Sequence, residues 1–300
     1  MRSCFCALLF CLLSLANADG ILAQGFDPQK FSEQFQNNFA PFGNFTNGMS
    51  RADRSELEKI PISLREENSF GASVLKGYEQ TLKSKNVKIT YGGADVEYLT
   101  TLVKQFRRHM KHGSRYRSFK VGIVELDETD AYSVPGGTLL FTRGLLESVE
   151  SEAALAGVVA HEMSHLDRQH QLIGLRQQKR FQKSANFKNM MANIFEIAKP
   201  FHAEFESEAD VDAVKWLLAE KYDPQELAHL LRRWNNRQDA KQPWLDAMPQ
   251  FMLTHPDAGK RAADVEQLLR QSRHRGQELQ AGIENLKQRI PLAENPNLDR

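Results

Sequence analysis

The stretch SEAALAGVVAHEMSHL, residues 151–166, decides the fold because nearly all of its residues are small or apolar. A segment of this kind predicts a helix that is packed against neighbours on several sides. Glu150 and Glu152 stand where its first turn is expected, and carboxylates there are stabilised by the positive end of the helix dipole. The sequence therefore predicts a buried helix at the centre of a folded domain.

Two histidines in this helix have the spacing of metal ligands. His161 and His165 are four residues apart, so their Cβ atoms lie on one face at roughly 5–6 Å, and both imidazoles can reach one zinc ion at about 2.0–2.1 Å. Glu162 is rotated by about 100° around the helix and can act on a metal-bound water without being a ligand. This arrangement, HExxH, is typical of zinc hydrolases; the alternative is a structural helical protein with a chance match.

A third ligand is expected from the acidic segment EFESEAD, residues 204–210. On a helix with about 100° per residue, Glu206 and Asp210 fall on the inward stripe, whereas Glu204 and Glu208 fall on a face that we expect to be solvated. Carboxylates within an apolar stripe are costly unless they are paired or bound to metal. We therefore assign Glu206 as the third ligand and Asp210 as the hydrogen-bond acceptor for a ligand histidine. The alternatives are an ordinary charged helix, or a third ligand among His170, His202 and His229.

The composition is that of an ordinary globular protein. The chain has 300 residues, of which 41% are hydrophobic and 26% charged, and this usage excludes wholesale disorder, collagen and a disulfide scaffold. The formal net charge is +1. A nearly neutral chain has no global field that attracts nucleic acid, so we expect no nucleic-acid partner.

The first residues have the pattern of a secretory signal peptide. Arg2 precedes an apolar run over residues 4–16, and Ala16 and Ala18 flank an expected cut. We predict that residues 1–18 are removed on export; an uncleaved anchor is the alternative. No later segment has 18 uninterrupted apolar residues, so we expect no transmembrane helix. Residues 1–18 contain every cysteine of the chain, namely Cys4, Cys6 and Cys11, so the rest of the chain is expected to have no disulfide.

The rest of the chain divides into a linker, a domain and a tail. Residues 19–60 are rich in Phe, Asn and Gln and are expected to be a flexible linker, with a partner surface as the alternative. Residues 61–272 form the expected domain, and residues 273–300 a C-terminal helix and frayed tail. Many helices and few strands predict an α+β fold with a small sheet. The expected helices cover residues 63–84, 94–112 and most of the chain from 151 to 288, and the expected strands cover residues 119–126 and 138–142.

These features together resemble the HtpX, CAAX prenyl protease and BepA group of gluzincin metallopeptidases. HExxH on a helix is followed, 41 residues after His165, by the pattern Glu-x-x-Ala-Asp that begins at Glu206. Asp130 and Lys221 depart from the group's pattern, which has Asn and Gly at these positions. The resemblance covers about residues 61–270, through further matches at residues 66–71, 131–138, 151–170, 221–224 and 254–256.

The resemblance implies a mainly helical zinc-metallopeptidase domain whose small sheet presents an edge strand to the cleft. A polypeptide substrate is then expected to add as a strand along residues 138–142. His255, in a Thr-His-Pro segment, is expected to donate a hydrogen bond to the oxyanion or to cap the open position of the metal, with an ordinary loop histidine as the alternative. The residues expected to contact the substrate are Gly136, Gly137, Thr138 and Leu139.

We therefore predict a zinc-dependent endopeptidase that binds one Zn²⁺ per chain. The metal lowers the pKa of its bound water towards about 7; Glu162 takes the proton and passes it to the leaving amine. The soluble periplasmic branch of the family implies secretion across the inner membrane and clearance of misfolded envelope polypeptides, with an extracellular or anchored form as the alternative. A rival function is a non-proteolytic, chaperone-like zinc protein of the same fold.

Residues 166–201 are basic in their first part and apolar in their second part. We expect a solvated helix that leads into core packing. The alternatives are a gate over the cleft, or a surface for a membrane or a partner such as an outer-membrane assembly.

Overall fold

The computed structural model describes residues 51–182, 203–238, 255, 257–271 and 278–298. The predicted signal peptide, most of the predicted linker, His202 and the part of the basic and apolar segment after residue 182 lie outside these residues. The described residues fall into two compact units. The first contains residues 51–85 and 171–182, and the second contains the remainder.

The first unit consists of three helices: α3 (Arg51–Glu58), α4 (Leu64–Ser84) and α8 (Ile173–Gln182). α4 confirms the helix predicted over residues 63–84, and it begins at a capping box. The amide of Glu66 donates to Oγ of Ser63 at 3.3 Å, and the amide of Ser63 donates to Oε2 of Glu66 at 2.8 Å. α8 packs on α3, and Nε of Arg176 donates to the carbonyl of Ile60 at 3.2 Å.

The second unit contains a four-stranded sheet with the strand order β1-β2-β4-β3. Its strands are β1 (Ile89–Thr90), β2 (Lys120–Val124), β3 (Ala131–Val134) and β4 (Thr138–Thr142). β2 and β4 pair in parallel, whereas the other neighbours are antiparallel. The strands predicted over residues 119–126 and 138–142 are confirmed as β2 and β4, and the sheet is small, as predicted.

The expectation that a substrate adds along residues 138–142 is wrong. All five residues of β4 are buried, and β4 lies between β2 and β3. Thr138 and Leu139 pair with β2 on one side and with β3 on the other, so both edges of β4 are used within the sheet. β3, which pairs with β4, forms one edge of the sheet, and β1 forms the other.

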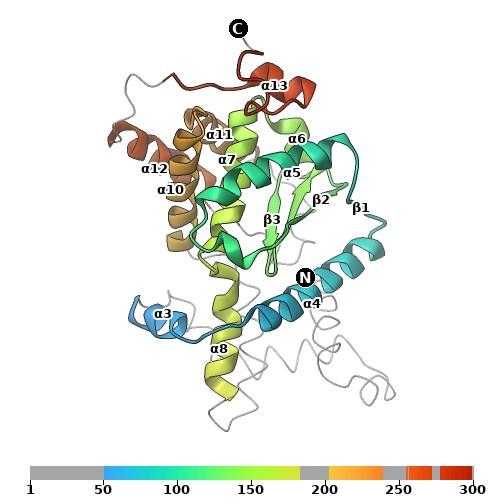
Figure 1. The fold of residues 1–300 in the computed structure, drawn as a ribbon, viewed down its shortest axis with the longest axis vertical. Coiled ribbons are helices and arrows are strands. Elements are labelled where there is room, and N and C mark those ends of the chain that lie inside the picture. The colour runs from blue at the N-terminus through green and yellow to red at the C-terminus, as the bar shows by residue number, and fades with distance from the viewer. Residues whose placement is uncertain (1–50, 183–202, 239–254, 256, 272–277, 299–300) are drawn as a thin grey trace. The chain divides into compact units, whose positions relative to one another are not determined.

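Helices pack around this sheet, as Figure 1 shows. The predicted helix over residues 94–112 ends earlier, at Phe106, and continues as a 3₁₀ turn to His109. The helices are α5 (Ala94–Phe106), α6 (Arg143–Ser148), α7 (Glu152–Asp167), α10 (Ala203–Ala219), α11 (Gln225–Gln238), α12 (Ala258–Gln271) and α13 (Ile283–Gln288). The 3₁₀ turns are η4 (Arg107–His109), η5 (Gly113–Arg115) and η6 (His170–Leu172).

α7 is the predicted central helix, and all of its residues are buried. It contacts α5, α10, α11 and β3. Its N-terminus is capped by Ser151, whose side chain accepts a hydrogen bond from the amide of Ala154 at 3.2 Å. Gly157 allows α11 to come close, because a Cβ atom at this position would lie 3.1 Å from Cβ of Leu227. The C-terminal half of α7, which carries His161, Glu162 and His165, is therefore packed inside the second unit.

The C-terminal segment is docked rather than frayed, contrary to expectation. The amide of Ala153 donates to the carbonyl of Ala281 at 2.9 Å, and the amide of Leu292 donates to Oε1 of Glu152 at 2.6 Å. Nδ2 of the buried Asn285 donates to the carbonyls of Ile290 and Asn295, both at 2.9 Å. Hydrogen bonds of this kind hold the segment against the start of α7.

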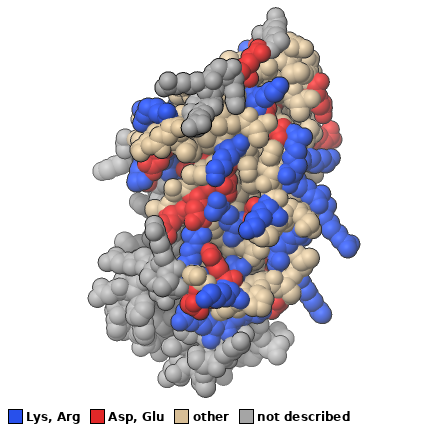
Figure 2. Space-filling model, turned by 60° about the vertical axis from the view of Figure 1, so that its left-hand side comes forward, with Lys and Arg blue, Asp and Glu red and all other residues tan. Residues whose placement is uncertain are grey.

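The surface in view in Figure 2 carries both signs of charge, with Lys and Arg side chains beside Asp and Glu side chains. Ion pairs in the second unit join helices to one another, as between Arg232 and Glu266 at 2.5 Å. Among the described residues, no helix combines the length and the apolar character that crossing a membrane requires.

Candidate active site

Two packed helices bring the predicted site residues together. α7 carries His161, Glu162 and His165, and α10, which packs on α7, carries Glu206. Nε2 of His161 lies 3.0 Å from Nε2 of His165. Nε2 of His161 lies 3.5 Å from Oε2 of Glu206, and Nε2 of His165 lies 3.4 Å from Oε1 of Glu206. All four side chains are buried.

These residues fit a divalent metal ion. A tetrahedral zinc ion with bonds of about 2.0–2.1 Å places its ligand atoms roughly 3.3 Å apart, close to the separations observed here. Oε1 of Glu206 and Oε2 of Glu162 are buried and make no hydrogen bond within the described part of the chain. A buried carboxylate oxygen without a hydrogen bond is costly, and a cation with its bound water would satisfy both oxygens.

His255 completes the donor cluster from the segment before α12. Its ligand atom and those of His161, His165 and Glu206 all lie within 4.8 Å of one another. Nδ1 of His255 is 2.9 Å from Oε2 of Glu206, and its Nε2 is 3.1 Å from Oε1 of Glu162. Burial opposes protonation of this ring, but the carboxylates of Glu206 and Glu162 raise the pKa of His255 well above its ordinary value.

The rival ligands are placed elsewhere. His229 is on α11 with a side chain that is 53% exposed, and it contacts Glu226. His170 is buried, but it faces the far side of His165 and does not belong to the donor cluster. Among the described residues, Glu206 is the carboxylate that meets both histidines, where the helical periodicity placed it.

Asp210 lies behind His161. Its Oδ1 is 2.8 Å from Nδ1 of His161, so Nδ1–H can donate to the carboxylate while Nε2 faces the donor cluster. Arg261 of α12 supports this contact, since its Nη2 donates to Oδ1 of Asp210 at 2.7 Å. Burial would raise the pKa of Asp210, but Arg261 and His161 lower it to about 2.

Arg261 is a further site residue, to which helical periodicity assigns no role. It is buried, and its Nη1 also contacts Oε2 of Glu206 at 3.0 Å. Its sequence signal is limited to its position shortly after the Thr-His-Pro segment. A buried guanidinium between two carboxylates balances part of their charge, which explains why both can remain ionised.

The protonation states of His165 and Glu162 suit a metal site. Burial lowers the pKa of His165 to about 3, so its ring is neutral and has a lone pair to offer a metal. Burial opposes ionisation of Glu162, but His255 and the two α7 histidines lower its pKa to about 2. Glu162 is therefore a carboxylate at neutral pH and can accept a proton.

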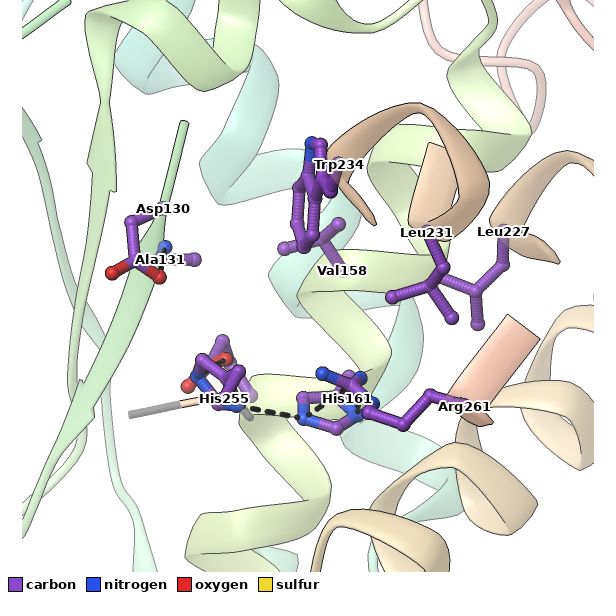
Figure 3. A pocket seen from close by; sticks show the side chains of 10 residues that line it. Asp130, Ala131, Val158, His161, Leu227, Leu231, Trp234, His255 and Arg261 are labelled. Atoms are coloured by element: carbon purple, nitrogen blue, oxygen red, sulfur yellow. Dashed lines mark hydrogen bonds and ion pairs between the residues drawn. The ribbon is translucent and has the colours of Figure 1, made fainter. Parts of the chain in front are cut away.

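A cavity opens beside the donor cluster (Figure 3). Asp130 and Ala131 form one side, at the start of the edge strand β3, and Trp234 and Leu231 of α11 lie across from them. His161 and His255 lie below. The cavity is lined by Asp130, Ala131, Val158, His161, Glu162, Leu227, Leu231, Trp234, His255 and Arg261.

The four predicted substrate contacts do not line this cavity. Gly136 and Gly137 form the turn between β3 and β4 with φ values of 87° and 91°, a conformation that favours glycine. Thr138 and Leu139 are buried within the sheet. Their place at the cavity is taken by Asp130, which the sequence marked only as a departure from the family pattern, and by Ala131.

Comparison with known proteins agrees with this geometry. The model of Peptidase family M48 matches residues 97–269. The chain is 24% identical over 274 residues to the mitochondrial metalloendopeptidase OMA1 of Schizosaccharomyces pombe, covering 86% of this chain and 79% of that one. It is 25% identical over 154 residues to OMA1 of Arabidopsis thaliana, covering 48% of this chain and 30% of that one.

A bacterial relative matches a smaller share of its own length. The chain is 23% identical over 231 residues to the beta-barrel assembly-enhancing protease of Escherichia coli, covering 68% of this chain but 46% of that one. The family match spans β2, β3, β4, α7, α10 and most of α12, and it contains every residue of the donor cluster. The chain therefore belongs to Peptidase family M48 and is a metalloprotease.

Proposed function

We propose that this protein is a zinc-dependent endopeptidase in which His161, His165 and Glu206 hold the metal and Glu162 is the general base. The observation that supports it most is the convergence of these donors from α7 and α10, at separations of 3.0–3.5 Å. Oε2 of Glu162 is buried beside them without a hydrogen bond among the described residues, where a reacting water needs an acceptor.

Each side chain has a defined task in the reaction. His161, His165 and Glu206 would hold a zinc ion, which would supply a water of lowered pKa and a Lewis acid for the scissile carbonyl. Glu162 takes the proton of that water and later delivers it to the leaving amine. Asp210 accepts a hydrogen bond from Nδ1 of His161 and so keeps its Nε2 directed at the metal.

His255 has two proposed roles. Its ring can donate a hydrogen bond to the oxyanion of the tetrahedral intermediate, or it can cap the open position of the metal in a resting form. Its contacts with Glu162 and Glu206, at 3.1 and 2.9 Å, support the capping role in this conformation, because they hold the ring beside both the proposed metal ligand and the proposed general base. Faster proteolysis by His255→Ala would indicate capping, and slower proteolysis would indicate oxyanion stabilisation.

The substrate is proposed to be an unfolded polypeptide presented along β3. β3 is one of the two edge strands of the sheet, and Ala131 at its start lines the cavity. Recognition through the main chain places few demands on substrate sequence, which suits the clearance of misfolded proteins. We propose that these are envelope proteins met after export, on the basis of residues 1–18 and of the bacterial relative's name.

The test combines metal analysis with degradation of unfolded casein. We expect the wild-type protein to bind one zinc per chain and to cleave casein. Glu162→Gln should keep the zinc and lose at least about 10²-fold in rate, because the proton acceptor is removed. Glu206→Ala should lose both metal and activity, since two protein ligands remain.

Each outcome separates the alternatives. Zinc binding without cleavage by the wild-type protein would favour the chaperone-like function. Full activity in Glu162→Gln would remove Glu162 from the mechanism, and full zinc content in Glu206→Ala would show that the third ligand was wrongly assigned. Lys215→Gln, an exposed substitution on the same helix α10, is the matched control.

A further inference from the structure

His165 is contacted from behind by a second imidazole. Nδ1 of His170 lies 2.9 Å from Nδ1 of His165, on the side of the ring that faces away from the donor cluster. The other nitrogen of His170, Nε2, lies 3.1 Å from Oε2 of Glu208 on α10. Three side chains thus follow one another in contact: His165, His170 and Glu208.

The end of α7 brings His170 to this position. α7 ends at Asp167, with the amide of Arg168 donating to the carbonyl of Ser164 at 2.8 Å. Gln169 then adopts a left-handed conformation with φ of 59°, which turns the chain back on the helix. His170 is only 3% exposed, and its ring stacks on the ring of Phe205, with 4.4 Å between the ring centroids.

The position of each proton in these contacts follows from which nitrogen of His165 faces the donor cluster. Nε2 of His165 faces the donor cluster, so the proton of a neutral ring must be on Nδ1. That Nδ1–H can donate only if Nδ1 of His170 is an acceptor, which leaves the proton of His170 on Nε2. Nε2–H then donates to the carboxylate of Glu208, and every contact has one donor and one acceptor.

Glu208 is held in place as well. Nη1 of Arg168 donates to its Oε2 at 3.0 Å, and the same guanidinium pairs with Asp212 at 2.5 Å. Glu208 was expected on a solvated face, but its side chain is only 30% exposed. The sequence did not reveal this role because His170 lies on no helical face shared with Glu208.

We propose that His170 and Glu208 form a positioning relay for the metal ligand His165, fixing its tautomer and ring orientation. The inference rests on the proposed zinc site. His161 has a carboxylate, Asp210, in direct contact with its Nδ1 at 2.8 Å, whereas Nδ1 of His165 contacts the ring of His170, which in turn contacts the carboxylate of Glu208. Partners of this kind raise metal affinity by about 10–100-fold.

The test measures zinc affinity by chelator competition in the full chain, with three substitutions. His170→Phe keeps the stacking on Phe205 but removes both hydrogen bonds, and we expect about 10–100-fold weaker zinc binding. His170→Asn keeps an acceptor for His165 and should recover much of the affinity. Glu208→Gln should weaken binding in the same direction by less, and His229→Asn is the control for loss of an exposed histidine.

Two further readouts separate positioning from packing. The absorption spectrum of the Co²⁺-substituted protein should change in His170→Phe, because the orientation of His165 is altered, and should return towards wild type in His170→Asn. The thermal midpoint of the metal-free protein should be the same for these two variants. If the role of His170 is merely structural, His170→Phe should lower the thermal midpoint of the metal-free protein and leave the Co²⁺ spectrum unchanged.

The outcomes that overturn the relay differ from those that overturn the function. Wild-type protein that binds zinc, beside a His170→Phe variant that binds it equally well, would overturn the relay alone. If His170→Phe does not fold, unchanged zinc affinity in Glu208→Gln would overturn it instead. Wild-type protein without zinc would overturn the proposed function and the relay with it.

Discussion

Asp130 brings an additional carboxyl group to the cavity that contains Glu162 and His255. Burial raises the pKa of Asp130 to about 7, although His255 acts in the opposite direction. An unfolded Asp titrates near about 3.9, so between about pH 4 and pH 7 the folded protein binds more protons than the unfolded chain. The stability of the metal-free protein should therefore fall as the pH rises through this window.

Asp130→Asn removes this titration, because an amide is neutral throughout the range. We expect metal-free Asp130→Asn to lose less stability than metal-free wild type between pH 4 and pH 7, by more than about 1 kcal/mol. Urea unfolding at a series of pH values measures this difference. Glu97→Gln, at an exposed position on α5, should follow the wild type, and coincident pH profiles for wild type and Asp130→Asn would contradict the prediction.

At the scale of the element, α7 depends on how its first turn is anchored. Oγ of Ser151 accepts from the amide of Ala154 at 3.2 Å and donates to Oε2 of Glu226 at 2.7 Å. One hydroxyl therefore caps α7 and ties it to α11. The metal donors are three turns further along the same helix, so their spacing depends on a helix that is continuous from this cap.

Ser151→Ala removes the cap and leaves the carboxylate of Glu226 with one partner fewer. We expect it to lower the free energy of unfolding by about 1–2 kcal/mol, as measured by urea denaturation. Ser73→Ala is the comparison, since Ser73 lies within α4 and its hydroxyl donates an exposed hydrogen bond to the carbonyl of Ser69, and a change within about 0.5 kcal/mol is expected there. Equal stabilities of the two variants would argue against the capping role.

At the scale of the whole molecule, residues 278–298 belong to the same unit as the donor cluster. Glu152 is fully buried, and its carboxylate accepts hydrogen bonds from the hydroxyls of Tyr98 and Tyr222 and from the amide of Leu292. Residues from α5, from the segment after α10 and from the C-terminal segment thus meet at the start of α7. A buried carboxylate needs this many donors to remain satisfied.

Asn285→Ala tests whether this docking contributes to stability. It removes both donors to the carbonyls of Ile290 and Asn295 and leaves these carbonyls unsatisfied, so we expect a loss of about 1–3 kcal/mol. Thermal unfolding should show a lower midpoint, whereas Asn297→Ala, at an exposed position, should not. If both variants have the same thermal midpoint as the wild type, the segment is docked without stabilising the unit.

The sequence by itself determined the central helix, the two-histidine spacing and the carboxylate that meets it. These features follow from helical periodicity, which is a local property of the chain. Four residues separate His161 from His165 on one face, and the same period distinguishes Glu206 and Asp210 from their neighbours. The family followed from the order of such segments, and the α+β class from the excess of helical patterns.

Only the tertiary structure decided which residues from distant segments meet. It placed β4 inside the sheet and β3 at its edge, so the expected contacts at residues 136–139 gave way to Asp130 and Ala131. It placed Arg261 between two carboxylates, and it turned His170 back between His165 and Glu208. Strand order and helix packing are set by the burial of many side chains at once, so no local pattern encodes them.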